Sequence, residues 1–510
     1  MVSSRPGSNT AKPCWAPTSS SFGPNPVIPS NGDLSPVPPI IPFSRRLLLS
    51  RGTAGVGLLG LANVFGQEAS SPLDAHSPHS APRAKRIIHL LMNGGPSHID
   101  TFDPKPLLAK YEGQRPSTVD LNTQRKTTGI LKSPYRFAQH GDSGLWVSEL
   151  FPHVARHADK LCLIHSMHTD IPEHISGLLM MSVGANQPTR PSFGSWLSYG
   201  LGTENQDLPS FVVISHNGHP RPGPTGWSSS FLPGVHSGAF VDTYKLDPKR
   251  VIADIRNPGM PRGSQRRQFE LLQRMNRLEL DRSGTDRALE ARIESLELAF
   301  RMQFAAPEAF DISRESKATH DLYGIGPQPT KGVAGGRKYG GFAEGALIAR
   351  RLSERGVRVV QLAFAPDIPW DDHTDINDHR PKAFECDQAI AALLTDLESR
   401  GLLDETLVLW GGEFGRTPTT DVTANKPGRD HNHFGFTVWM AGGGVKPGFR
   451  YGATDEFGMR AVENRTHVRD LHATILHLMG LDHQRLTFRH SGRDFRLTDV
   501  GGRVIQDVIA

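Results

Sequence analysis

The chain has 510 residues, of which 37% are hydrophobic and 21% are charged, so it is long enough for one large α/β domain or two ordinary domains. Its formal net charge of +5 comes from 57 basic and 52 acidic residues. This mild excess argues against a nucleic-acid-binding protein, because no dense stripe of Lys and Arg with interleaved aromatic residues accompanies it.

The amino-terminal part of the chain predicts a tail followed by an export signal. Residues 1–43 are rich in Pro, Ser and Gly and are expected to form a disordered extension. Residues 44–70 look like a twin-arginine signal, with Arg45 and Arg46 ahead of an apolar stretch that is shorter than the roughly 20 residues needed to span a bilayer. The alternative is a short buried helix after the tail. We therefore expect export by the twin-arginine route to the periplasm or the cell exterior, with no stable membrane span after signal removal.

A polar linker is predicted at 71–85 and one large domain at 86–510. Short apolar runs predict strands, and helical periodicity closed by glycine predicts helices. The predicted strands cover 87–92, 160–166, 211–214, 357–364, 406–415 and 436–443. The predicted helices cover 148–159, 173–184, 345–356, 384–401 and 468–480, with a charged helical excursion at 264–303.

Strands that alternate with helices predict an α/β fold, with a doubly wound, mostly parallel sheet that carries helices on both faces. In such sheets the ligand site lies at the carboxyl ends of the strands. We therefore expect polar residues that follow the strands to meet at one edge of the sheet.

Groups of polar residues, mostly Asp, Glu and His, follow four of the predicted strands. They are Asn93, His98, Asp100 and Asp103; His165, His168, Asp170 and His174; Asp371, Asp372, His373 and Asp375; and Glu413, Arg416, Arg429, Asp430, His431 and His433. Carboxylates neutralise a divalent ion and neutral imidazoles complete its coordination, so the combined pattern favours a metal site. The alternative is a set of solvated loop and turn residues. The three cysteines form no CxxC pair, which argues against a thiolate zinc site.

Several sequence blocks carry a family resemblance. The stretches "HLLMNGGPSHIDTFDPKP", "WDDHTD", "GGEFGRTP", "GRDHNHFG" and "DLHATILHLMGLDH" resemble the signature blocks of the uncharacterised DUF1501 family over most of the chain. That family is related to the alkaline phosphatase/sulfatase superfamily, so the resemblance implies an alkaline-phosphatase-like fold. The chain departs from the superfamily pattern at Asn93, where an aspartate is expected, and at Glu413 and Phe414, where Asp-His is expected.

The resemblance implies an exported hydrolase of phosphate or sulfate esters that uses one or two divalent ions, either zinc, calcium or magnesium. The absence of a CxPxR motif argues against ordinary sulfatase chemistry. The expected partner is a small anionic ester or a sulfated or phosphorylated glycan, and not nucleic acid. The alternative is a catalytically degenerate secreted binding or structural module that keeps the fold.

The residues that would carry this chemistry follow from the same blocks. Arg416 and Arg429 are expected to hold the anion. His174 stands near the superfamily's nucleophile position and would act as the nucleophile, as a metal ligand or as a group that orients water. The expected metal ligands are Asp371, His373, Glu413, His431 and His433, supported by Asn93 or Asp100, and of the two late histidines His431 is favoured.

Overall fold

The computed structural model describes residues 73–118, 120–123, 125–244, 259–283, 287–326, 340–421 and 426–510. The expected tail and export segment lie outside these residues. The segment expected to be a linker is described from Leu73 onward, and its last residues are tied to the domain by backbone hydrogen bonds. Arg83 N and Ala84 N donate to Leu478 O at 2.8 and 2.9 Å.

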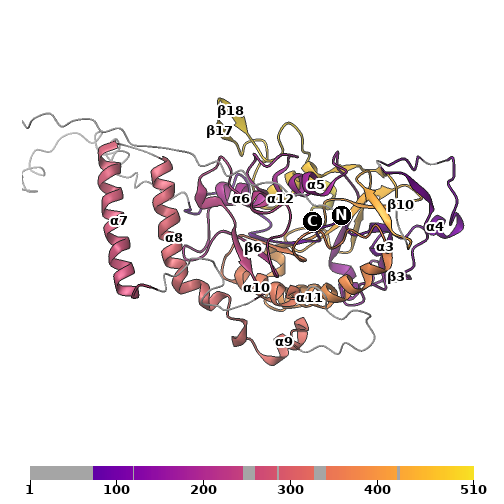
Figure 1. The fold of residues 1–510 in the computed structure, drawn as a ribbon, viewed down its shortest axis with the longest axis horizontal. Helices are drawn as coiled ribbons and strands as arrows, with labels where there is room; N and C mark the ends of the chain where they lie inside the picture. Colours follow the sequence, from indigo (N-terminus) through magenta and orange to yellow (C-terminus); the bar gives the residue numbers. More distant parts are fainter. Residues whose placement is uncertain are drawn as a thin grey trace, which may run out of the picture. The chain divides into compact units, whose positions relative to one another are not determined.

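Nine strands of the described part of the chain form the central sheet (Figure 1). From one edge to the other they are β13 (Phe449–Tyr451), β5 (Leu161–His168), β12 (Phe436–Ala441), β9 (Thr406–Gly411), β1 (Arg86–Leu91), β8 (Val359–Ala363), β6 (Phe211–Ser215) and β7 (Ala239–Asp242), and β16 (Thr466–His467) pairs with β5. β1 pairs in parallel with both β8 and β9, and β6 pairs in parallel with β7 and β8. β12 is antiparallel to β5 and β9, which leaves β5 parallel to β9.

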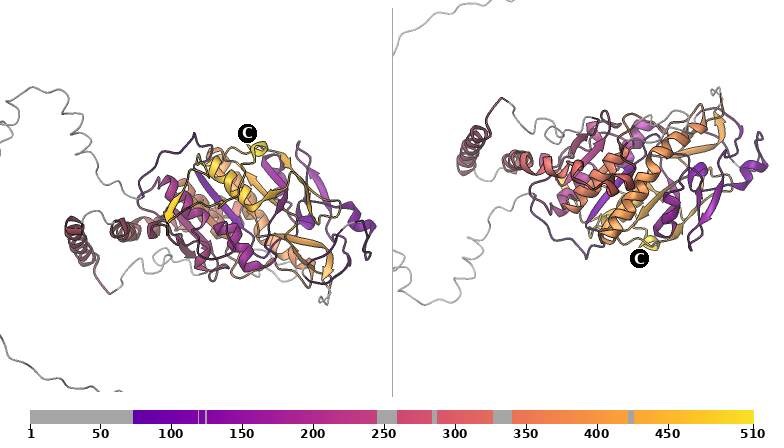
Figure 2. Two further views of the ribbon diagram at one scale, coloured as in Figure 1. Left: turned by 90° about the horizontal axis from the view of Figure 1, so that it is seen from above. Right: turned by 90° about the horizontal axis from the view of Figure 1, so that it is seen from below.

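Helices cover both faces of this sheet, because its strands are apolar on both sides. On one face Ile88 and Leu90 pack in the same core as the helices α10 (Phe342–Glu354) and α11 (His379–Ser399). On the other face Ile87 packs with α5 (His174–Val183), α6 (Phe193–Leu201) and α12 (Val468–Leu478). Figure 2 shows α12 in yellow from above and the orange helices of the opposite face from below. The predicted α/β fold with a mostly parallel sheet is confirmed.

The charged excursion forms two long helices, α7 (Arg262–Ser283) and α8 (Arg287–Ala309), followed by α9 (Lys317–Tyr323). The rings of Phe269 and Phe300 stack between α7 and α8 with their centroids 4.8 Å apart. None of the helices that the structure describes combines the length and the apolarity needed to cross a membrane. Cys162 and Cys386 are both buried and free.

Small sheets and short helices complete the described domain. They are the three-stranded sheet of β11 (Arg429–Asn432), β10 (Gly415–Asp421) and β2 (Thr127–Ile130), the pairs β3 (Phe137–His140) with β4 (Leu145–Ser148), β14 (Ala453–Thr454) with β15 (Ala461–Glu463) and β17 (Phe488–His490) with β18 (Arg493–Phe495), and the helices α3 (His98–Thr101) and α4 (Pro106–Lys110). A helix was predicted over 148–159, but the structure has a 3₁₀ turn at Val154–Lys160 instead. Pro152 restricts the backbone before this turn, and His157 leaves the helical conformation inside it.

Four buried histidines make the fold sensitive to acid. Burial lowers the pKa of His89 to about 3 and the pKa values of His165, His236 and His472 to about 4. Above the unfolded value of about 6.5 these imidazoles are neutral in both states. Below it only the unfolded chain binds the protons, so we expect each histidine to lower the free energy of unfolding by about 1.4 kcal/mol per pH unit until its folded pKa is reached.

Thermal unfolding between pH 8 and pH 5 measures this effect. We expect the midpoint to change little from pH 8 to pH 7 and to fall steeply below pH 6.5. The variant His472→Gln keeps a donor for Met181 O, which His472 Nε2 contacts at 2.8 Å, and should show a shallower fall. A midpoint that stays level down to pH 5 would contradict the prediction.

Candidate metal centre

Four of the polar residues that follow strands meet at the carboxyl edge of the sheet. His174 is the first residue of α5, which follows β5, and Asp371 and His373 lie in the loop between β8 and α11. His431 lies on β11. The start of α5 is fixed by its N-cap, Glu173, whose carboxylate accepts hydrogen bonds from Ile175 N and Ser176 N at 3.1 and 2.6 Å.

The Oδ1 atom of Asp371 contacts all three histidines of this cluster. It is 3.1 Å from His174 Nε2, 3.0 Å from His373 Nε2 and 3.2 Å from His431 Nε2. The Nε2 atoms of His373 and His431 are themselves 3.0 Å apart. One ligand atom from each of the four residues lies within 4.8 Å of the other three. The structure therefore presents three imidazole nitrogens and one carboxylate oxygen to a single point.

The opposite nitrogen of each ring has an oxygen partner. His174 Nδ1 lies 2.6 Å from Glu413 Oε1, and His373 Nδ1 lies 2.8 Å from Asp421 Oδ2. His431 Nδ1 lies 2.8 Å from the backbone carbonyl oxygen of Pro172, which can only accept a hydrogen bond. These contacts favour a proton on every Nδ1 and leave the Nε2 lone pairs directed at the common point. Histidines that bind metals show the same arrangement in proteins.

The spacing of the four ligand atoms fits a small four-coordinate ion. In a tetrahedral zinc site with bonds of about 2.0–2.1 Å, neighbouring ligand atoms are about 3.3 Å apart. The four separations given above, from 3.0 to 3.2 Å, are close to that value. Calcium and magnesium prefer six or more oxygen ligands, so a set dominated by imidazole nitrogen suits zinc better.

A buried arginine, Arg416, places a positive charge beside the Asp371 carboxylate of the cluster. Arg416 Nη2 lies 2.7 Å from Asp371 Oδ1, and its side chain is fully buried. Although burial alone would raise the pKa of Asp371, the Arg416 guanidinium and the three imidazoles hold it well below its usual range. Burial alone would lower the pKa of His174, but its contacts with the Asp371 and Glu413 carboxylates raise it, so a bound ion would displace a proton from Nε2. Burial lowers the pKa of His431, which favours the neutral imidazole that a metal needs.

The glycine-rich loop after β1 supports Glu413 and Arg416. Gly94 N is 3.1 Å from both carboxylate oxygens of Glu413, and Arg416 Nε donates to Gly95 O at 2.9 Å. Gly94 has a φ of +110°, and a Cβ there would come within 2.6 Å of Trp370 N, so no other residue fits without a shift of the loop. The loop thus positions the groups that hold His174 and Asp371.

Other residues expected in the site lie behind or beside the cluster. Asn93 Nδ2 donates to Ala365 O at 2.9 Å, which braces the loop that carries Asp371. His433 is outside the four-residue group, and its ring lies against Phe434 with centroids 3.9 Å apart. Glu413 touches His174 and not the common point, so it supports a ligand.

Arg429 and Asp100 form an ion pair with both side chains fully buried. Arg429 Nε lies 2.7 Å from Asp100 Oδ2, and Arg429 Nη2 lies 3.2 Å from Asp100 Oδ1. Burial alone would raise the pKa of Asp100, but Arg429 lowers it below its usual value. The guanidinium of Arg429 also donates to Thr417 O at 3.2 Å. This arginine therefore joins α3 to the small sheet and is directed into the protein.

Sequence reasoning missed three residues of the site. Asp421, at the end of β10, is the partner of His373 and also belongs to a second group of potential ligands with His373 and Asp430. Arg125 and Arg221 line a cavity of about 400 Å³ above His174 and His431. Nothing in the sequence around these residues marks them, because their role depends on which strands and loops lie next to each other.

Residues 84–509 match the family model described as "Protein of unknown function (DUF1501)". No curated protein matches the sequence. Among solved structures, Ps i-CgsB in complex with k-i-k-neocarrahexaose is 10% identical with a TM-score of 0.35, and the match covers 78% of this chain and 72% of that chain. The lipoteichoic acid synthase LtaP from Listeria monocytogenes is 10% identical with a TM-score of 0.33, covering 88% and 82%. The PsFucS1 sulfatase from Pseudoalteromonas sp. is 11% identical with a TM-score of 0.32, covering 78% and 68%. At these scores the likeness does not extend to function.

Metal content distinguishes His431, which lies on β11, from His433, which lies in the loop after it. We expect the purified chain to bind about one zinc ion, and His431→Gln to weaken that binding at least about 100-fold because a ligand nitrogen is lost. The matched control His433→Gln should bind zinc as the parent does. Elemental analysis and titration with a competing chelator measure both. Equal loss in the two variants, or no zinc in the parent, would contradict the assignment.

The buried ion pair is expected to stabilise the fold without taking part in metal binding. Asp100→Asn leaves Arg429 without its charged partner, so we expect a loss of about 3–5 kcal/mol in the free energy of unfolding. The double variant Asp100→Leu with Arg429→Met removes both charges and should recover much of that loss while still binding zinc. Denaturant unfolding measures the difference. A stable Asp100→Asn variant would show that Arg429 is free for another role.

Proposed function

The chain belongs to the DUF1501 family, and from the four-residue cluster we propose that it is an exported, metal-dependent hydrolase of phosphate or sulfate esters. The metal is held by His174, Asp371, His373 and His431. The export part of the proposal is supported by the sequence of residues 44–70, which lie outside the described structure.

The observation that carries the proposal is the short contact between His373 Nε2 and His431 Nε2, 3.0 Å apart. His431 Nδ1 faces a carbonyl oxygen and His373 Nδ1 faces a carboxylate, so both rings favour the tautomer with a bare Nε2. Two bare nitrogens at this separation repel each other, and a cation bound by both removes that repulsion. A divalent ion satisfies both nitrogens, together with His174 and Asp371.

When bound, such an ion supplies Lewis-acid chemistry, because it polarises an ester oxygen and makes water a nucleophile near neutral pH. The chain fixes where this happens. Glu413 and Asp421 hold the rings of His174 and His373 in place, and Arg416 orients the Asp371 carboxylate. His174 acts as a ligand in this scheme, because its Nε2 faces Asp371 and its Nδ1 is engaged by Glu413.

The anion is contacted by the arginines at the mouth of the 400 Å³ cavity. Arg221 lies 3.0 Å from Asp367 with its side chain 57% exposed, and Arg125 lies 3.7 Å from Asp421 with 55% exposed. Both can turn toward a phosphate or sulfate group, which Arg binds through two parallel hydrogen bonds. Among the described residues that line this cavity none is Ser, Thr or Cys, which favours direct attack by water over a covalent enzyme intermediate.

The test compares turnover in matched variants of the zinc-loaded chain. With an aryl phosphate and an aryl sulfate as substrates, we expect His431→Gln to reduce kcat/KM at least about 100-fold and His433→Gln to leave it unchanged. Arg221→Ala should raise KM about 10-fold with little change in kcat, because it removes charge-assisted hydrogen bonds to the anion. The control for charge is Arg489→Ala, an exposed arginine that pairs with Asp494 away from the cavity.

A chain that binds zinc stoichiometrically and cleaves neither ester would overturn the enzyme proposal and favour the secreted binding module. A chain that cleaves esters equally well with and without a chelator would instead remove the metal from the mechanism.

A further inference from the structure

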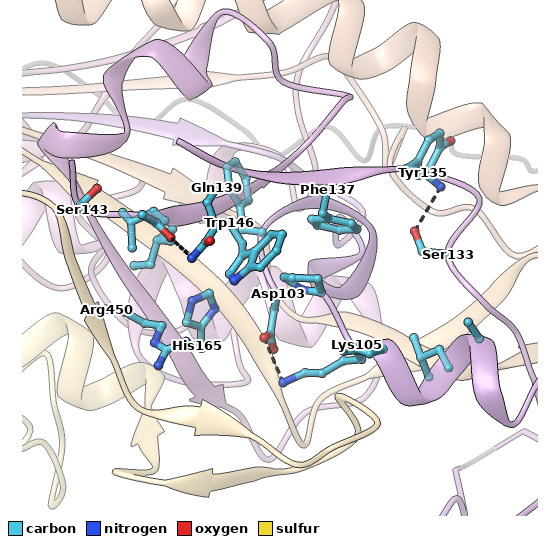
Figure 3. A pocket seen from close by; sticks show the side chains of 18 of the residues that line it. Asp103, Lys105, Ser133, Tyr135, Phe137, Gln139, Ser143, Trp146, His165 and Arg450 are labelled. Atoms are coloured by element: carbon cyan, nitrogen blue, oxygen red, sulfur yellow. Dashed lines mark hydrogen bonds and ion pairs between the residues drawn. The ribbon is translucent and has the colours of Figure 1, made fainter. Parts of the chain in front are cut away.

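A larger cavity, of about 900 Å³, lies away from the metal cluster (Figure 3). Its walls are the β3–β4 hairpin, the segment that leads into α4, the edge strand β13 and its neighbour β5. None of its lining residues lines the 400 Å³ cavity at the metal cluster. The two cavities are therefore separate places on the same domain.

The β3–β4 hairpin presents an aromatic surface to this cavity. Gln139 and Trp146 are cross-strand partners, and Phe137 lies two residues before Gln139, so the three side chains share one face of the hairpin. Figure 3 shows them side by side. Trp146 is 39% exposed, whereas its neighbours Leu145 and Val147 point into the core and are 5% and 0% exposed. Packing in the core thus does not explain the position of the Trp146 side chain. Its ring is exposed and available to a ligand.

The opposite wall is polar, and its buried charges are already balanced. Asp103 Oδ1 lies 2.9 Å from Lys105 Nζ, and Asp103 Oδ2 accepts a hydrogen bond from Thr454 Oγ1 at 2.6 Å. His165 is buried, and its Nδ1 lies 3.0 Å from Thr437 Oγ1. This wall offers hydrogen-bonding groups without an unpaired negative charge.

Arg450 supplies the unbalanced positive charge of the cavity. It lies on β13, opposite Leu163 of β5, and is exposed. No hydrogen bond or ion pair joins its guanidinium to any residue that the structure describes, and Figure 3 shows it beside His165 at the cavity wall. Lys132, the other lysine of the lining besides Lys105, is paired with Glu112 at 3.0 Å. A ligand with an anionic group would find Arg450 without a competing partner.

We propose that this cavity is a binding site for an acidic saccharide. The flat rings of Trp146 and Phe137 pack against the apolar faces of sugar rings, and Gln139 with the opposite polar wall meets the hydroxyl groups. Arg450 pairs with the carboxylate or ester anion of the sugar. The volume is within the range of small-ligand pockets, which is about 300–1,000 Å³. The site holds a saccharide without cleaving it, and it does not depend on the hydrolase function proposed for the metal cluster.

Isothermal titration of the full chain tests the proposal with four probes: a heparin hexasaccharide, a polygalacturonate hexamer, neutral maltohexaose and inorganic sulfate. We expect an acidic saccharide to bind at least about 10-fold more tightly than maltohexaose or sulfate. Trp146→Ala and Arg450→Gln should each weaken that binding at least about 10-fold. Both residues are exposed, so the variants should fold, and circular dichroism verifies this.

Two kinds of control locate the binding. Tyr244→Ala and Arg489→Gln change an exposed aromatic ring and an exposed arginine elsewhere, with side chains outside this cavity, and should bind as the parent does. His431→Gln should retain saccharide binding, because it alters only the metal cluster. Acidic saccharides that bind no better than maltohexaose or sulfate would overturn the proposal. Equal binding by all variants, or loss of binding only in His431→Gln, would overturn it as well.

Discussion

The contact of three imidazole nitrogens with the Oδ1 atom of Asp371 is the interaction on which the rest of the site depends. A cation at this point would join the nitrogen lone pairs to the carboxylate, whereas the charge of Arg416 pairs, among these four residues, with Asp371. Around this point each ring is held from behind by an oxygen acceptor, and the acceptors are in turn held by backbone groups such as Gly94 N. The polar structure of the carboxyl edge is thus organised outward from a place that suits one cation.

The sheet explains how residues so distant in the sequence come together. Parallel neighbours end at the same edge, which brings the loop after β8 next to the loops after β1 and β9. The large sheet does not supply His431 or Asp421. Both come from the three-stranded small sheet, in which Arg416 of β10 pairs with His431 of β11. Strands β10 and β11 of this sheet thus carry Arg416, His431 and the carboxylate of Asp421 that contacts His373.

The sequence was sufficient for the fold class and for six of the nine strands of the central sheet, because these strands are continuous apolar runs. It also identified Asp371, His373 and His431 as residues that follow strands, and the structure brings them together with His174. It could not reveal that Arg429 is directed into the protein toward Asp100, since that depends on how α3 packs. It could not identify Asp421 either, because the contact of Asp421 with His373 joins residues 48 positions apart and no local pattern encodes it.

The place of β12 in the sheet determines when the site can form during synthesis of the chain. β12 lies between β5 and β9, so in the described sheet it is the strand that joins the side that carries His174 to the side that carries Asp371 and His373. It is formed by residues Phe436–Ala441, near the carboxyl terminus. A nascent chain that has not yet released this segment from the ribosome lacks the strand that pairs with both β5 and β9. A chain truncated before β12 would therefore retain most of its length but lack the strand that places His174 beside Asp371 and His373.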